Sequence, residues 1–254
     1  MFIVWGKKLV YRKIGHVADF CPICRQPRAF TLQRLGMASH VYYLSSGQGD
    51  LVGYERVCGS CHTAFEANPD TYAALAKKAG TLEELRRTTF PNLEQVCASR
   101  LALEEQIRSN PASLTREDRH LLIRSPFLLL SPKVEKRFAS THLDKEIGFA
   151  MAGALLLLLV GPALVQAIAP DHGEEGVIAF IAAGVLLVGW QCAMAGRRFM
   201  RRQIIPVLAD TLQPLRPGQD EIERVMHELK QLRHQIGSRC KPGDLLAQMR
   251  NSQA

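Results

Sequence analysis

Lysine and arginine are absent from residues 147–196, although the chain of 254 residues contains 32 of them and has a formal net charge of +8. The acidic residues of this segment are Asp171, Glu174 and Glu175, which lie together near its middle. Long apolar stretches without a basic residue are typical of segments that cross a lipid bilayer, where a charged side chain is costly. We therefore expect an integral membrane protein.

Motifs of common enzyme classes are also absent. The sequence has no Gly-x-x-x-x-Gly-Lys-Ser/Thr phosphate loop, no Gly-x-Gly-x-x-Gly dinucleotide motif, no Gly-x-Ser-x-Gly nucleophile turn and no His-Glu-x-x-His zinc motif. The two apolar runs of the membrane segment contain no charged residue of the kind that marks an ion or proton pathway. We expect no catalytic residue and no enzymatic activity.

A secretory signal peptide and a disulfide framework are not expected either. The apolar run at the start of the sequence is too short and is followed by the bases Lys7 and Lys8. Four of the seven cysteines form two Cys-x-x-Cys pairs, and the other three are scattered along the chain. This pattern suits a reducing compartment and a single metal site.

Two apolar runs, 147–169 and 177–196, are each long enough to cross a bilayer as a helix, because about 20 residues at about 1.5 Å per residue span its hydrocarbon core. Neither run has the polar face that a buried helix of a soluble protein normally shows. The polar, turn-forming link 170–176 is so short that the two helices must be antiparallel. The sequence therefore predicts a transmembrane hairpin over residues 147–196.

Basic residues flank the two runs on their outer sides and are absent from the link. Cytoplasmic loops are enriched in Lys and Arg, so we expect both termini in the cytoplasm and the 170–176 link outside, in the inner membrane of a bacterium. The lipid bilayer is then the first partner of the chain. The flanking bases are Lys133, Lys136, Arg137 and Lys145 before the first run, and Arg197, Arg198, Arg201 and Arg202 after the second.

The two Cys-x-x-Cys pairs are Cys21 with Cys24 and Cys58 with Cys61. Each pair offers two thiolates from one tight turn, and two such turns complete a tetrahedral site that suits Zn²⁺ in a structural role. Iron is the alternative, as in rubredoxin, although Arg25 and His62 stand where rubredoxin-like turns usually have glycine. The neighbouring histidines are interpreted as non-ligands, since four thiolates already fill the site; they are His16, His40 and His62.

Segments with the composition of β-strands surround the two pairs. They are 2–4, 8–11, 31–44 and 51–57, with a hairpin turn over 45–50. The opening Phe2-Ile3-Val4-Trp5-Gly6-Lys7-Lys8, followed by Cys21-Pro22-Ile23-Cys24, resembles the zinc-ribbon membrane proteins of uncharacterised function found in bacteria. The resemblance covers about residues 1–66 and implies a fold and a metal, not a reaction.

The expected fold class is mixed, with a small β-rich zinc ribbon over 1–68 and α-helices elsewhere. A mostly helical cytoplasmic segment follows over 69–146, then the transmembrane hairpin over 147–196 and a helical cytoplasmic segment over 197–254. Helical periodicity and capping residues predict helices over 71–79, 81–87, 92–109, 115–123, 220–236 and 245–249. The 81–87 helix has a capping box formed by Thr81 and Glu84.

Three functions remain open. The first is a membrane-anchored scaffold or adaptor that binds a protein partner or a second copy of the chain. The second is electron transfer at iron, and the third is nucleic-acid binding by the ribbon. We favour the adaptor, because bases near a cytoplasmic membrane face are explained by attraction to anionic lipid. The residues that would serve nucleic-acid binding are Lys7, Lys8, Arg12, Lys13, Arg25, Arg28, Arg34, Arg56, Tyr42, Tyr43 and Tyr54.

Overall fold

The computed structural model describes residues 5–41, 44–45, 47–139, 144–168 and 173–251. The chain forms two compact units, which we call the first unit and the second unit. The first unit comprises Met1–Leu129 and Val207–Glu221, and the second comprises Leu130–Pro206 and Ile222–Ala254. Residues 207–221 therefore belong with the N-terminal part of the chain, although they follow both apolar runs in the sequence.

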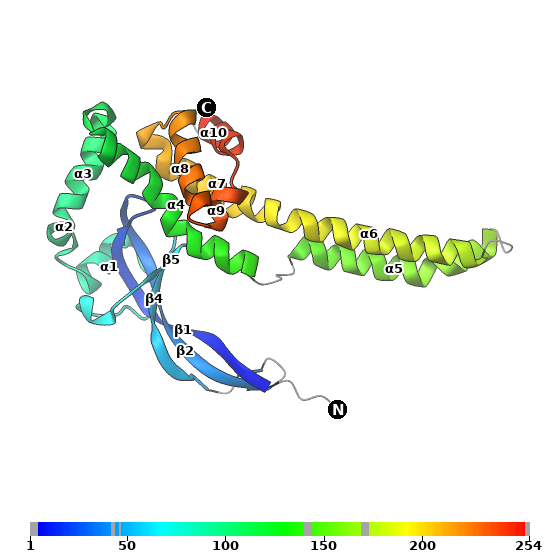
Figure 1. The fold of residues 1–254 in the computed structure, drawn as a ribbon. Helices are drawn as coiled ribbons and strands as arrows, with labels where there is room; N and C mark the ends of the chain where they lie inside the picture. The colour runs from blue at the N-terminus through cyan, green and yellow to red at the C-terminus, as the bar shows by residue number, and fades with distance from the viewer. Residues whose placement is uncertain (1–4, 42–43, 46, 140–143, 169–172, 252–254) are drawn as a thin grey trace. The chain divides into compact units, whose positions relative to one another are not determined.

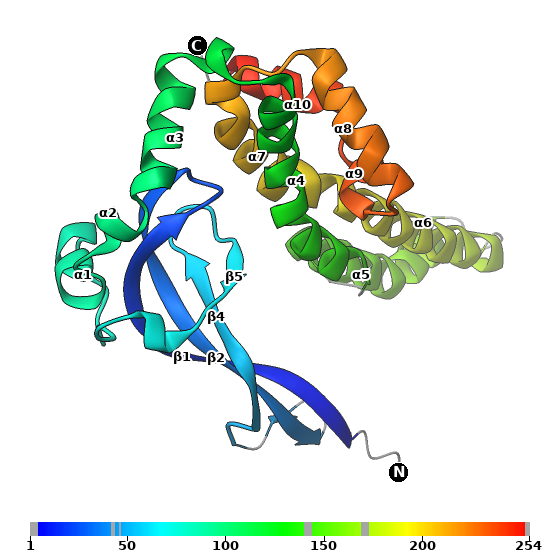
Figure 2. The same cartoon turned by 60° about the vertical axis from the view of Figure 1, so that its left-hand side comes forward.

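An antiparallel sheet forms most of the N-terminal part of the first unit (Figures 1 and 2). The strand order is β1-β2-β4-β5, and β3 pairs with β2. Three of the expected features lie wholly or partly outside the described residues, namely the strands over 2–4 and 31–44 and the turn over 45–50. The strand bounds are β1 Trp5–Cys21, β2 Gln26–Val41, β3 Leu44–Ser45, β4 Asp50–Cys58 and β5 Ala64–Glu66.

Strand β1 is a single long strand, whereas the sequence predicts only a short strand over 8–11 in this region. It pairs with β2 along its whole length, from Trp5 opposite Val41 to Cys21 opposite Gln26. The register shifts between Lys13 and Gly15, where a bulge interrupts the ladder. Cross-strand hydrogen bonds keep the polar residues of β1 extended, although their composition gives little strand signal.

The buried part of the sheet lies toward its cysteine-bearing end. Val17, Phe30 and Leu32 are buried there, and helix α1 (Leu82–Thr89) packs against β1. The hydroxyl of Thr89, at the end of α1, accepts a hydrogen bond from the Ala18 backbone N–H at 3.0 Å. This contact fixes α1 on the half of the sheet that carries the cysteines.

Short helices follow the sheet in the first unit. The predicted capping box is confirmed, since Thr81 and Glu84 bond each other's backbone N–H at the start of α1. The predicted helix over 71–79 is wrong, because Ala76 instead forms an isolated bridge with His16 through two backbone hydrogen bonds of 2.7 and 3.0 Å. The bounds are η1 Pro69–Thr71, α1 Leu82–Thr89, α2 Leu93–Val96, α3 Ala98–Ser109 and η2 Pro111–Ser113.

Helix α4 (Arg116–Ala139) is much longer than the predicted helix over 115–123. It continues through Pro126 and Pro132, although an interior proline costs a helix about 3 kcal/mol. Phe127 and Val134 lie on its buried stripe. Burial of that stripe offsets the cost of the prolines. Local sequence patterns do not reveal this burial.

Helices α5 (Lys145–Ile168) and α6 (Gly173–Phe199) lie side by side in the second unit and run antiparallel (Figure 1). Their facing residues show the direction, because Gly176 lies against Val165 and Gly184 against Ala154. Both helices are long and apolar enough to cross a membrane. Only 17% and 6% of their most apolar windows are buried, whereas a core helix of a soluble protein is mostly buried.

The chain continues from α6 as a π-helical turn and then as α7. Helix α8 ends before the predicted bound of 236, because Arg233 adopts a left-handed φ of 63° that breaks the helix. The apolar residues Ile222, Val225 and Leu229 of α8 are buried within the protein. The bounds are η4 Met200–Ile204, α7 Ile205–Leu212, η5 Gln213–Leu215, α8 Gln219–Gln231, α9 Gln235–Arg239 and α10 Pro242–Asn251.

Candidate metal centre

The first cysteine pair lies in the turn between β1 and β2. Cys21 ends β1 and pairs with Gln26 at the start of β2, so the intervening residues form a tight turn. The backbone N–H of Cys24 donates to the Sγ of Cys21 at 3.3 Å. Arg25 closes the turn with a φ of 56°, in the left-handed region where glycine is usual.

The second cysteine pair lies in the turn between β4 and β5 and repeats this arrangement. The backbone N–H of Ser60 donates to the Sγ of Cys58 at 3.4 Å. His62 follows Cys61 with a φ of 53°, and its backbone N–H donates to the Cys58 carbonyl at 3.1 Å. Both turns therefore direct backbone N–H groups at a sulfur atom, which stabilises a thiolate there.

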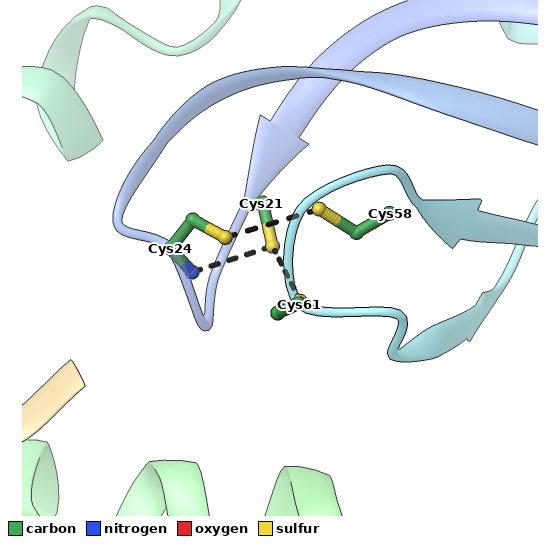
Figure 3. Close-up of side chains that lie close together, drawn as sticks. All are labelled: Cys21, Cys24, Cys58 and Cys61. Atoms are coloured by element: carbon green, nitrogen blue, oxygen red, sulfur yellow. Dashed lines mark hydrogen bonds between the residues drawn. The ribbon is translucent and has the colours of Figure 1, made fainter. Parts of the chain in front are cut away.

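The sheet brings the two turns together, because β2 pairs with both β1 and β4. Phe30 on β2 lies opposite Cys58, and the Gly59 N–H donates to the Ala29 carbonyl at 2.9 Å. The Sγ atoms of Cys21 and Cys61 are 3.7 Å apart, and those of Cys24 and Cys58 are 3.8 Å apart (Figure 3). All four Sγ atoms lie within 4.8 Å of one another.

These distances fit a tetrahedral metal site. A metal–sulfur bond of about 2.3 Å places the sulfur atoms of a regular tetrahedron about 3.8 Å apart. Two of the sulfur–sulfur distances match that value, so a metal ion could bind without a large movement of the turns. Four thiolates fill every position of such a site, which leaves no place for a reactive water molecule.

Hydrogen bonds between the four cysteine side chains raise the pKa of some of them and lower the pKa of others. Bonds from Cys21 and Cys24 lower the pKa of Cys58 to about 6, and bonds from the other three cysteines also lower the pKa of Cys61. Bonds to the neighbouring cysteines, together with burial, raise the pKa of Cys21. A metal ion replaces the shared protons and holds all four groups as thiolates, so its affinity falls as the solution becomes acidic.

A buried ion pair supports the first turn. The Arg25 side chain points inward and is only 4% exposed, and its Nη1 lies 3.1 Å from the Oε2 of Glu104 on α3. A second Arg25 nitrogen, Nη2, donates to the Leu122 carbonyl at 3.4 Å. Burial lowers the pKa of Arg25, and Glu104 opposes that shift. The arginine thus ties the cysteine turn to two helices of the first unit.

A residue from the C-terminal part of the first unit also supports this turn. The hydroxyl of Thr211 on α7 lies 2.9 Å from the Ile23 carbonyl and 2.7 Å from the Val207 carbonyl, and it donates a hydrogen bond in this arrangement. A cavity of about 250 Å³ lies beside it and is lined partly by Cys24 and Cys61. Residues 207–211 therefore lie beside the centre, on the side where these two cysteines are.

The histidines near the pairs lie outside the four-sulfur cluster. His16 is half-buried on β1 and lies 3.4 Å, by its Nδ1, from the Oγ1 of Thr31. His40 lies opposite Gly6, far along β2, and His62 is exposed. Of the other cysteines, Cys240 is buried and Cys192 is exposed, and neither belongs to the cluster.

Sequence reasoning brings together the correct four cysteines but misses their supports. Glu104 and Thr211 lie 79 and 188 residues from their partners in the first turn, so no local pattern connects them. Arg25 is the one support with a sequence signal. It stands where glycine is usual, so a stabilising contact of its side chain can be expected.

The fold and the four-sulfur cluster together define a class of site, in which two cysteine turns of one antiparallel sheet can hold a metal ion. Comparison of the chain with protein-family models, with curated proteins and with solved structures found no match.

Proposed function

We propose that the protein is a membrane-anchored adaptor. A structural zinc ion holds a ribbon built from the cysteine-bearing sheet, and α5 and α6 form a transmembrane hairpin that fixes the ribbon at the inner leaflet of a bacterial membrane. The mechanism is positional, because the protein presents a binding surface at the membrane and catalyses no reaction. The chain binds a protein partner or a second copy of itself on the cytoplasmic side.

The observation that carries this proposal is the exposed apolar surface of the helix pair. Phe149 and Leu159 on α5 are 77% and 69% exposed, and Leu186 on α6 is 72% exposed. Exposure of so many large apolar side chains to water is unfavourable, whereas contact with the hydrocarbon core of a lipid bilayer is not. Burial of α5 in lipid explains why this helix contains no charged residue between Ile147 and Ala163.

The metal has a structural role in this proposal. Small β-folds bury too little apolar surface to be stable alone, and a metal ion joins segments that are far apart in sequence. Zinc is preferred over iron because Arg25 and His62 replace the glycines that are common in rubredoxin-like turns. The sulfur geometry itself does not distinguish the two metals, since both form bonds of similar length to thiolate.

The surface for a partner is proposed at the end of the sheet that lies farthest from the cysteines. Trp5 and Leu44 are 81% and 80% exposed there, and Leu51 and Val52 are also exposed. The pairing of Trp5 with Val41 and of Gly36 with Leu51 places them at this end of the sheet. Exposed large apolar residues that gather at one end of a sheet are typical of protein-binding surfaces.

Nucleic-acid binding has less support from the positions of the bases. Arg25 is buried against Glu104, and Arg56 forms an ion pair of 2.8 Å with Asp19. Tyr42 and Tyr43 lie outside the described residues.

Metal analysis of the detergent-purified protein tests the proposal directly. We expect one zinc ion per chain and no colour in the visible spectrum. The Cys58→Ser/Cys61→Ser variant should lose the metal, and its sheet should become sensitive to proteases, whereas Cys192→Ser should keep both properties. A red protein with one iron ion would instead identify an electron carrier, and a metal-free wild-type protein would contradict the metal centre.

Photo-crosslinking tests the partner surface. A photoreactive amino acid at Leu51 should form a reproducible protein adduct in cells, whereas the same amino acid at the exposed Glu83 on α1 should not. Trp5→Ser/Val52→Ser should abolish the adduct at position 51. Adducts with RNA or DNA would favour nucleic-acid binding, and equal adducts at both positions would contradict a specific surface.

A further inference from the structure

The second unit contains a cavity of about 590 Å³ at the ends of its helices. The last residues of α4, the start of α5, the end of α6 and helix α9 contribute to its lining. The residues that matter for the argument are Arg137, Phe138, Ile147, Trp190, Arg197 and Arg239. The cavity lies where the apolar run of α6 ends at Arg197, which is the level of a lipid headgroup in the proposed orientation.

Positive charge dominates this cavity. Three arginines line it, and none of the lining residues that the structure describes is an aspartate or a glutamate. The acids at the start of α5 form their ion pairs with arginines outside the lining, since Asp144 lies 3.0 Å from Arg198 and Glu146 pairs with Arg202, although Asp144 also interacts electrostatically with Arg137. The cavity therefore has a strongly positive lining, and an anionic group is the ligand that complements it.

Aromatic and aliphatic groups form the other part of the lining. The guanidinium of Arg239 lies over the Phe138 ring at 4.7 Å, which fixes the charge at the edge of an apolar wall. Trp190 is 64% exposed and lines the same cavity on α6. A ligand that fits both parts of the lining has an anionic group joined to an apolar chain.

We propose that this cavity binds the headgroup of an anionic phospholipid, such as phosphatidylglycerol. The phosphate lies among Arg137, Arg197 and Arg239, and the acyl chains follow the exposed apolar surface of α5 and α6. A zwitterionic headgroup binds less well, because its ammonium group repels the arginines. The site rests on the proposed membrane anchoring, since it requires the helix pair to lie in lipid.

Quenching of Trp190 fluorescence by brominated lipids tests the site. The chain has two tryptophans, so Trp5→Phe leaves Trp190 as the single probe. The full chain is placed in bilayers of phosphatidylcholine with a small fraction of phosphatidylglycerol, and either lipid carries bromine on its acyl chains. Brominated phosphatidylglycerol should quench Trp190 at a mole fraction about tenfold lower than brominated phosphatidylcholine requires.

The control compares two variants that lose the same charge. Arg137→Gln/Arg197→Gln/Arg239→Gln should remove the preference for phosphatidylglycerol, whereas Arg201→Gln/Arg202→Gln/Arg224→Gln should keep it, because those arginines do not line the cavity. Equal loss in both variants would show general surface attraction and would overturn the site. Displacement of the preference by millimolar glycerol phosphate would indicate a site for a soluble phosphate, which also overturns the proposal.

Quenching in the Trp5→Phe chain, whose cavity is unaltered, distinguishes failure of the phospholipid site from failure of membrane anchoring. Equal quenching by both lipids would leave membrane anchoring intact and refute the phospholipid site. No quenching by either lipid would refute membrane insertion of α6 and, with it, the site. Because these outcomes come from the unaltered cavity, they do not depend on whether the triple variants fold.

Discussion

Arg25 occupies the turn position after the second cysteine of its pair, where its left-handed backbone costs about 1 kcal/mol relative to glycine. Glycine would relieve that cost but would remove the buried partner of Glu104, whose other ion pair is with the more exposed Arg100 at 2.9 Å. The side-chain exposures of the two residues are 5% and 3%, so the pair is shielded from water. At this residue, the requirement of the buried carboxylate outweighs the preference of the backbone.

Glu104→Ala tests the role of this pair. We expect the free energy of unfolding of the first unit to fall by about 3 kcal/mol, because the change leaves the Arg25 guanidinium buried and uncompensated. Arg25→Gly should have a smaller destabilising effect, because Arg100 still pairs with Glu104 and the backbone of the turn is relieved. The measurement is release of the bound metal ion to a coloured chelator as urea is added.

The neighbouring Glu105→Ala serves as the control for Glu104→Ala. Glu105 is exposed on the same helix, so its removal should change the release midpoint very little. If Arg25→Gly were more stable than the wild type, the strain of the turn would be the larger effect and the ion pair would be unimportant.

At the scale of elements, close contacts between glycine and larger side chains set the spacing of α5 and α6. A Cβ atom at Gly161 would lie 2.6 Å from the Cγ of Phe180, closer than side chains approach one another. A Cβ atom at Gly148, on the same helix, would meet nothing within 4 Å. The position of Gly161 therefore allows the two helices to approach closely, as small residues do in membrane helix pairs.

Gly161→Leu should destabilise the helix pair by about 1–3 kcal/mol, because the larger side chain must displace the Phe180 ring. The measurement is thermal unfolding in detergent, followed by the fluorescence of Trp190 in a Trp5→Phe background. Gly148→Leu is the matched control and should leave the unfolding midpoint unchanged. Equal midpoints for both variants would mean that the contact at Gly161 does not hold the pair together.

The elements that the sequence predicts well are those with a strong local signal. The apolar runs over 147–169 and 177–196 correspond to α5 and α6, because twenty consecutive apolar residues leave few alternatives to a helix. The 81–87 helix was located by its capping box. The elements that differ are β1, α4 and the 71–79 segment, whose conformations depend on partners distant in the sequence.

In the candidate site, too, the features with a local sequence signal are predicted, and those that depend on distant segments are not. The spacing of Cys21, Cys24, Cys58 and Cys61 sufficed to predict that they meet, because a Cys-x-x-Cys turn has one favourable geometry and a sheet places two such turns together. The contacts of Glu104 and Thr211 with the first turn join segments that only the folded chain brings together. No residue pattern near either position indicates that role.

At the scale of the whole molecule, the distribution of charge predicts an orientation in a membrane. All 32 lysines and arginines lie outside residues 147–196, and the three acids of that segment gather at the link. The predicted orientation rests on this distribution of charge. Residues 170–172 of the link lie outside the described residues.

Topology reporters test this orientation. We expect a fluorescent protein that matures only in the cytoplasm to fluoresce at either terminus, and a phosphatase active only outside to be active when inserted at Gly173. Replacement of Asp171, Glu174 and Glu175 by lysine should weaken the asymmetry and reduce phosphatase activity several-fold, because positive loops resist export. Replacement of the same residues by glutamine is the control and should retain the activity. Phosphatase activity at both termini of the unaltered chain would reverse the orientation and place the metal centre outside the cell.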